Sequence, residues 1–168
     1  MLKPSDLALL LLIAAYEDER ENWHQRRLAA ALQLSLGGIN QALQRLAHAP
    51  LYDAHFRRVQ RAHLREVLQT GLRFIYPTHP GEIAHGLPTA ASASPLKEAL
   101  GPGTQAYVWP HEQGDLQGLA VAPLTPGVVG AAQKYPRFHE YMALVDALRV
   151  GRARERAQAQ AILADRLG

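Results

Sequence analysis

Arginine side chains are concentrated in one part of this 168-residue chain. Residues 22–65 contain seven arginines, no lysine and a single acidic residue, Asp53. The planar guanidinium group forms paired hydrogen bonds to phosphate oxygens and to the edge of guanine. Residues 1–21 are rich in acids and residues 66–168 are balanced, so the excess positive charge is local. This block predicts a polyanionic partner.

The other residue types capable of catalysis or metal binding form no recognisable site. His79, Glu82 and His85 have the order H-x-x-E-x-x-H, but Pro80 and Gly81 disfavour the regular helix that would align them. The absence of cysteine excludes thiol catalysis and cysteine-bound zinc, and no serine has a G-x-S-x-G context. We therefore predict no enzyme, no metal and no cofactor. An enzyme using these histidines would need a bound metal.

A helix-turn-helix pattern lies inside the arginine-rich block, in residues 27–46 (RLAAALQLSLGGINQALQRL). This motif needs apolar residues where its helices cross, a small residue at their closest approach and a short break between them. Ala29 supplies the small residue, Gln33 to Ser35 supply the break, and Ser35 is placed to cap the second helix. The apolar positions are Leu28, Leu32, Leu34, Ile39 and Leu43.

This spacing resembles that of bacterial winged helix-turn-helix transcriptional regulators of the MarR-like and related classes, over residues 5–75. The resemblance implies a recognition helix over residues 36–47, with Ile39, Leu43 and Leu46 facing the core. Its exposed side chains would contact base edges in DNA, since amides pair with adenine and arginine with guanine. The candidate base contacts are Asn40, Gln41, Gln44 and Arg45.

The resemblance also implies a wing in residues 51–59. This segment has room only for a short hairpin, and no glycine marks its tip. Gly37 and Gly38 fall in the first turn of the recognition helix, which they weaken. The remaining arginines of the block are expected to position the domain on the DNA backbone. The candidate phosphate contacts are Arg26, Arg27, Arg57, Arg58, Arg61 and Arg65.

We expect a mainly α-helical protein with a small β component, in three parts. Residues 1–75 form the winged helix-turn-helix domain, and residues 76–104 form a Pro- and Gly-rich connection with a short helix at 95–100. Within it, residues 86–91 are expected to be packed and irregular, or to line a pocket or protein-binding groove. Residues 105–168 contain a hairpin, with strands at 105–109 and 118–124, followed by helices.

The C-terminal helices carry faces suited to packing. Phe138, Tyr141, Met142, Val145 and Leu148 form one apolar stripe, which packs on the domain or across a dimer. The terminal helices of MarR-like proteins build the dimer. The resemblance therefore implies a homodimer that places two recognition helices in successive major grooves.

The apolar run Leu7–Ala15 is predicted to be a buried helix that begins near Pro4 or Ser5. The run is too short to span a bilayer, and its leader lacks the pattern of a signal peptide. A helix that is apolar on every face must be covered all round, by the domain or by a second subunit as well. We expect a cytoplasmic protein with no membrane partner.

Two functions remain open for this sequence. The first is a dimeric, sequence-specific DNA-binding transcriptional regulator. The second is a protein-interaction module or antitoxin-like partner that binds another protein through residues 76–135. In that case the helix-turn-helix would be structural or serve only autoregulation.

Overall fold

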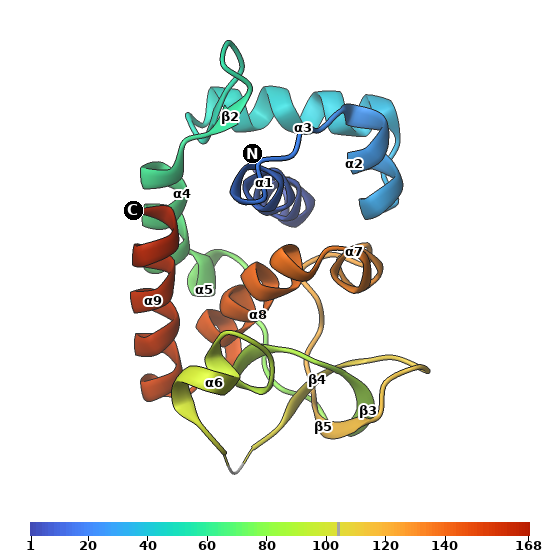
Figure 1. Cartoon of the computed structure of the whole chain (residues 1–168), viewed down its shortest axis with the longest axis vertical. Helices are drawn as coiled ribbons and strands as arrows, with labels where there is room; N and C mark the ends of the chain where they lie inside the picture. The colour runs from blue at the N-terminus through green and yellow to red at the C-terminus, as the bar shows by residue number, and fades with distance from the viewer. Residues whose placement is uncertain (104) are drawn as a thin grey trace.

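In the computed structural model, which describes residues 1–103 and 105–168, helix α1 (Pro4–Asp18) lies at the centre. Helix α3 (Leu36–His48) covers one side of it and α8 (Pro136–Val150) covers the other (Figure 1). All side chains from Asp6 to Tyr16 are buried. The helix begins at Pro4, as predicted, and the chain itself covers every face of it.

Helix α2 (Gln25–Leu32) and α3 are joined by three residues, which confirms the predicted break. Gln33 ends α2 in the left-handed conformation, with φ of 58°. The Oγ of Ser35 accepts a hydrogen bond from the N–H of Gly38 (2.9 Å), so the predicted cap of α3 is confirmed. A Cβ on Gly38 would lie 3.1 Å from that Oγ, a tight contact.

A short antiparallel hairpin follows α3. Strand β1 (Tyr52–Asp53) pairs with β2 (Arg58–Val59), and the chain then continues into α4 (Arg61–Thr70) and α5 (Leu72–Ile75). The hairpin tip projects beyond α3, on the side of α3 that faces away from α1 (Figure 1). A short hairpin therefore forms although its tip contains no glycine.

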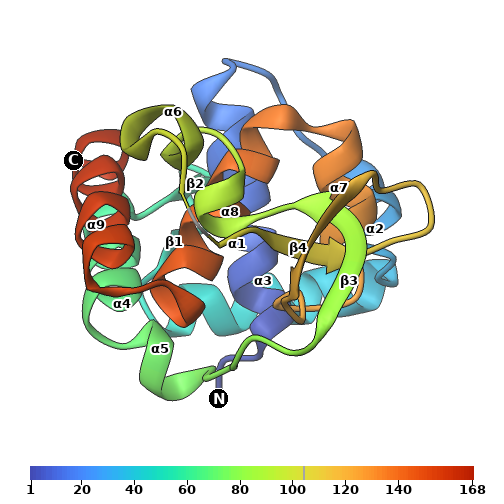
Figure 2. The same ribbon diagram turned by 90° about the horizontal axis from the view of Figure 1, so that it is seen from below.

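The hairpin predicted in the second half of the chain is wrong, because its strands belong to a small three-stranded barrel. Strands β4 (Tyr107–Pro110) and β5 (Leu116–Ala120) run parallel, and β3 (Ile83–Pro88) pairs antiparallel with both. Strand β3 covers part of the segment predicted to be irregular. The barrel lies at the end of the molecule opposite α3, and Figure 2 looks onto it from below.

Glycines in and between the strands allow the backbones of the barrel to lie in close contact. A Cβ on Gly86 would lie 1.9 Å from the carbonyl oxygen of Trp109. A Cβ on Gly114 would lie 2.1 Å from the carbonyl carbon of Gly86, and one on Gly118 would lie 2.7 Å from the backbone of Ala106. Any other residue at these positions forces the backbones apart.

One short 3₁₀ turn and three further α-helices complete the fold of the described residues. They are the 3₁₀ turn η1 (Ala90–Ser92), α6 (Leu96–Leu100), α7 (Val128–Lys134) and α9 (Ala153–Leu167). Helix α6 confirms the short helix expected at 95–100. The apolar stripe of residues 138–148 is buried inside the chain, and α9 packs along α4 and α8. One hydrophobic core includes residues from all three parts expected from the sequence.

A buried polar cluster attaches α8 to the barrel side of the molecule. The fully buried carboxylate of Asp146 accepts hydrogen bonds from Thr89 Oγ1 (2.7 Å), Trp109 Nε1 (2.8 Å) and Arg149 Nη1 (3.1 Å). Burial raises the pKa of Asp146, against the opposing effect of these three donors. The cluster therefore provides buried polar contacts among α8, Thr89 and strand β4.

The protein is mainly helical, at 57% of the chain, with two small sheets. Over residues 1–103 and 105–168, no helix is both long enough and apolar enough to cross a membrane.

Candidate nucleic-acid interface

The outer face of α3 presents polar side chains in a continuous stripe. Ile39, Leu43 and Leu46 face the core as expected. Asn40, Gln41 and Gln44 are exposed, and within the described part of the chain their amides make no hydrogen bond. A side-chain amide without an internal partner can donate one hydrogen bond and accept another at the same time. The edge of adenine offers one acceptor and one donor for such a pair of bonds. Three of the four predicted base contacts are thus free to bind.

Arg45 differs from the other three, because its guanidinium is occupied inside the chain. Nε and Nη2 donate to the two carboxylate oxygens of Asp6, at 2.8 and 2.9 Å. Asp6 is fully buried in the first turn of α1, where its carboxylate also accepts from the N–H of Lys3 (2.9 Å). The hydrogen bond to Asp6 raises the pKa of Arg45, so this side chain stays charged. Arg45 therefore attaches α3 to α1.

The hairpin tip carries two exposed arginines and an exposed phenylalanine. The Arg57 guanidinium stacks over Trp23, 4.3 Å from the ring centroid, and that of Arg58 lies 5.1 Å from the centroid of Phe56. Stacking occupies the face of a guanidinium but leaves its N–H groups at the edge available for phosphate oxygens. Arg57 and Arg58 are therefore exposed on a hairpin that projects beyond α3 (Figure 1).

Arg61 and Arg65 of α4 lie against other parts of the chain. Arg61 pairs with Glu17 (3.1 Å) and Asp18 (2.9 Å) and also donates to two backbone carbonyl groups, those of Ala14 and Arg166. Arg65 is half-buried beside Gly168 at the end of α9. Arg61 thus holds α4 to its neighbours, whereas Arg65 makes no hydrogen bond or ion pair in the described residues. Acids before residue 22 neutralise part of the arginine block.

Arg26 and Arg27 begin α2 and are exposed. The guanidinium of Arg27 lies 5.9 Å from the ring centroid of Tyr16. It lines a hollow of about 410 Å³ together with Tyr135 and Lys134, where the α7–α8 junction meets the end of α1. Arg27 therefore faces the C-terminal helices, whereas Arg26 makes no hydrogen bond or ion pair in the described residues.

The structure adds three exposed residues that the sequence reasoning missed. His48 continues the stripe of Asn40 and Gln44 at a spacing of four residues, a signal that was present in the sequence. Leu36 is 47% exposed at the start of α3 and Phe56 is 62% exposed at the hairpin tip. The exposure of these two apolar residues could not be read from their types, which favour burial.

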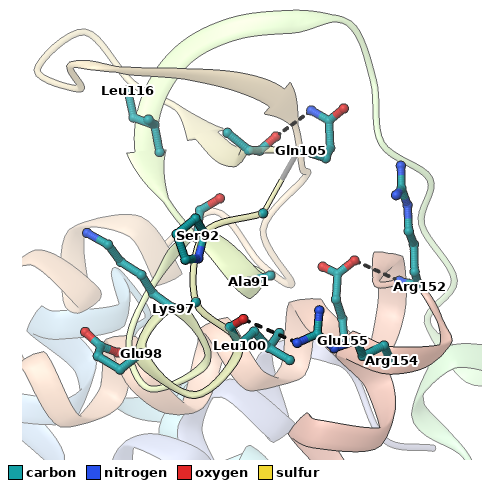
Figure 3. A pocket seen from close by; sticks show the side chains of 14 residues that line it. Ala91, Ser92, Lys97, Glu98, Leu100, Gln105, Leu116, Arg152, Arg154 and Glu155 are labelled. Carbon is teal, nitrogen blue, oxygen red and sulfur yellow. Dashed lines mark hydrogen bonds between the residues drawn. The ribbon is translucent and has the colours of Figure 1, made fainter.

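A second hollow lies far from α3, between α6 and the first turn of α9 (Figure 3). Its volume is about 760 Å³, within the range of small-molecule sites. Lys97 and Arg152 lie on opposite sides of it, and its apolar lining includes Ala91, Leu100 and Leu116. Its charged lining is mixed, because Glu98 and Glu155 face the same hollow, and the hollow does not adjoin the polar stripe of α3.

The histidine-containing segment does not assemble a metal site. Strand β3 begins at Ile83, so His85 lies on an extended segment and His79 in the preceding loop. No group of three or more His, Asp or Glu side chains arranged to hold a metal ion occurs in residues 1–103 and 105–168.

Comparison of the chain with protein-family models, with curated proteins and with solved structures found no match.

Proposed function

We propose that this protein binds double-stranded DNA as a winged helix-turn-helix regulator of transcription. In the element order α1, α2, α3, β1, β2, α4, helix α3 would be the recognition helix and the β1–β2 hairpin the wing. One observation carries the proposal. Asn40, Gln41 and Gln44 on α3 are exposed and make no hydrogen bond in the described residues. The hairpin that carries exposed arginines projects beyond this helix (Figure 1).

The structure supports a smaller contact set than the sequence does. Asn40, Gln41 and Gln44 are the proposed base contacts, with His48 beside them. The proposed phosphate contacts are Arg26, Arg57 and Arg58. Arg45 and Arg61 are left out because they pair with acids of the chain. Arg27 is left out because it faces the C-terminal helices, and Arg65 because it is half-buried beside the end of α9.

We further propose that the protein acts as a homodimer. One recognition helix contacts only a few base pairs, whereas two copies related by a two-fold axis occupy successive major grooves, about 34 Å apart. The preferred site is then an inverted repeat that binds two chains.

The test is selection of bound sequences from a random duplex pool, followed by fluorescence anisotropy on the selected site and on an unrelated duplex. We expect the logarithm of the binding constant to fall linearly with the logarithm of the salt concentration. Gln44→Ala should weaken binding to the selected site by about 1–3 kcal/mol and leave the unrelated duplex unaffected. Arg58→Ala should weaken both and reduce the salt slope by about one.

Gln117→Ala is the matched control, since Gln117 is an exposed glutamine on β5 at the opposite end of the molecule. It should bind like the wild type. If the wild-type protein enriches no sequence and shows no salt-dependent binding to any duplex, DNA binding is excluded.

A further inference from the structure

The hairpin tip holds an apolar ring in solvent. Phe56 is 62% exposed, whereas Trp23 and Tyr52 at the base of the same hairpin are buried. The aromatic residues in and beside this hairpin therefore form two groups. Those at the base stabilise the hairpin, and Phe56 extends from its tip.

Local contacts fix this arrangement. The Oδ1 atom of Asp53 accepts hydrogen bonds from the N–H groups of His55 and Phe56, both at 3.0 Å. Arg57 then adopts a left-handed backbone conformation, with φ of 54°. A residue with a Cβ is disfavoured in this conformation, and such outliers persist where surrounding contacts over-determine them. Here the contact is the stacking of Arg57 on Trp23, which returns this side chain to the hairpin base.

The surroundings of the ring are cationic. The guanidinium of Arg58 lies 5.1 Å from the ring centroid, and the ring of His55 meets it edge-on at 4.7 Å. Two acids contact this hairpin: Asp53 binds the two tip amides, and Glu17 binds the N–H of Val59 and the side chain of Arg61. A single aromatic ring among positive charges does not match the contiguous apolar patch of a protein-docking surface. It matches the apolar wedges that enter the minor groove of DNA.

We propose that Phe56 is such a wedge: it inserts at a base-pair step in the minor groove and kinks the duplex, while Arg58 contacts the adjoining phosphates. This inference rests on the proposed DNA binding through α3. With α3 in the major groove, the hairpin that projects beyond it is placed to reach the neighbouring groove (Figure 1). The easily unstacked pyrimidine–purine steps are the expected points of insertion.

The chain contains a closely matched control for this wedge. Phe74 on α5 is 72% exposed, and the guanidinium of Arg73 lies 5.0 Å from its ring centroid. Phe74 therefore has the chemistry and the cationic neighbour of Phe56, but it lies outside the hairpin. The experiment compares Phe56→Ala, Phe56→Leu and Phe74→Ala with the wild type.

The measurement uses the selected duplex with 2-aminopurine placed in turn at each step and a donor–acceptor pair at its ends. The wild type should raise 2-aminopurine fluorescence at one step beside the α3 contacts and shorten the end-to-end distance. Phe56→Ala should abolish both signals and weaken binding roughly tenfold or more, as expected for loss of one aromatic–base stack. Phe56→Leu should retain part of the bend, and Phe74→Ala should match the wild type.

The outcomes separate this inference from the function on which it rests. If the wild type binds DNA without a fluorescence change or a bend, or if Phe56→Ala bends DNA as the wild type does, the wedge is excluded and DNA binding stands. An equal loss in Phe56→Ala and Phe74→Ala also excludes a specific wedge. If the wild type binds no duplex, the proposed function fails first. Circular dichroism of each variant confirms that it is folded.

Discussion

The pair formed by Arg45 and Asp6 shows how one side chain on α3 can serve stability instead of recognition. Asp6 is fully buried, so its carboxylate needs a partner, and Arg45 provides two parallel hydrogen bonds. The side chain of Arg45 is 26% exposed, which leaves its outer edge in solvent. The pair therefore fixes the position of α3 on α1, and with it the direction in which Asn40 and Gln44 point.

We predict that Arg45→Met lowers the free energy of unfolding by about 2–4 kcal/mol, because it leaves a buried carboxylate without its charged partner. Asp6→Asn introduced into Arg45→Met should restore part of that loss, since it removes the unpaired charge. The measurement is urea denaturation of the single and double variants.

The neighbouring Gln44→Ala serves as the control and should change stability by less than about 0.5 kcal/mol. If Arg45→Met is as stable as the wild type but loses its preference among DNA sequences, Arg45 is a base contact and its role in holding α3 is minor.

Residue exposure along α3 could largely be predicted from its helical period, whereas the partner of Arg45 could not. The spacing of Ile39, Leu43 and Leu46 defines the inner face of the helix, and the structure confirms it. Asp6 is 39 residues away, and an acid in the first turn of a helix is favoured by the helix dipole alone. Long-range ion pairs of this kind leave no periodic signal in the sequence.

The pairing of the barrel strands is the part of the fold that the sequence predicts wrongly. Strand β3 has the sequence IAHGLP, in which glycine and proline interrupt any alternation of apolar residues. Strands β4 and β5 lie close in sequence with Gly114 between them, which is typical of a hairpin. Their parallel pairing arises because β3 binds both strands, a non-local event. The helices, by contrast, were predictable because their caps and periods are local.

We predict that Gly86→Ala lowers the free energy of unfolding by about 3 kcal/mol or more. Its Cβ would lie 1.9 Å from the carbonyl oxygen of Trp109. The two backbones must move apart to relieve this clash, which disturbs the packing around them. Gly130→Ala is the matched control, since Gly130 lies in α7 with nothing within 4 Å of an added Cβ.

In a helix this second substitution should stabilise by about 0.5–1 kcal/mol. Thermal and urea unfolding of both variants measure the two effects. Equal stability of Gly86→Ala and the wild type would show that the three strands do not approach as closely as the structure indicates.

At the scale of the whole molecule, charges connect the two ends of the chain. Asp18 at the end of α1 accepts from Tyr141 Oη (2.5 Å) and Arg137 Nε (2.9 Å) of α8 and pairs with Arg61 of α4 (2.9 Å). Arg166 of α9 joins this group through Glu140 (3.0 Å). Some arginines of residues 22–65 therefore pair with acids inside the chain. The arginines of this block that remain exposed lie at the start of α2 and at the hairpin tip.

The protonation states of this group follow from burial and from its neighbours. Burial alone would raise the pKa of Asp18, but the hydrogen bonds from Tyr141 and Arg137 and the charge of Arg61 outweigh it and lower that pKa. Burial, together with the hydrogen bond to Asp18, raises the pKa of Tyr141 to about 12. Tyr141 thus remains a protonated donor, and Asp18 remains ionised over the neutral range.

A lowered folded-state pKa makes Asp18 a source of acid sensitivity. Its contribution to stability is complete above the unfolded-state pKa and is lost as the pH falls below about 4, through the folded-state pKa. Asp18→Asn should therefore be less stable than the wild type by about 1–3 kcal/mol at pH 7, and the difference should shrink steadily between pH 4 and pH 2. Urea denaturation at constant ionic strength measures both proteins across this range. Asp165→Asn, at an exposed carboxylate with no ion pair in the described chain, should follow the wild type at every pH. A difference between Asp18→Asn and the wild type that stays constant down to pH 2 would mean that packing of the side chain, and not its charge, connects α1 with α4 and α8.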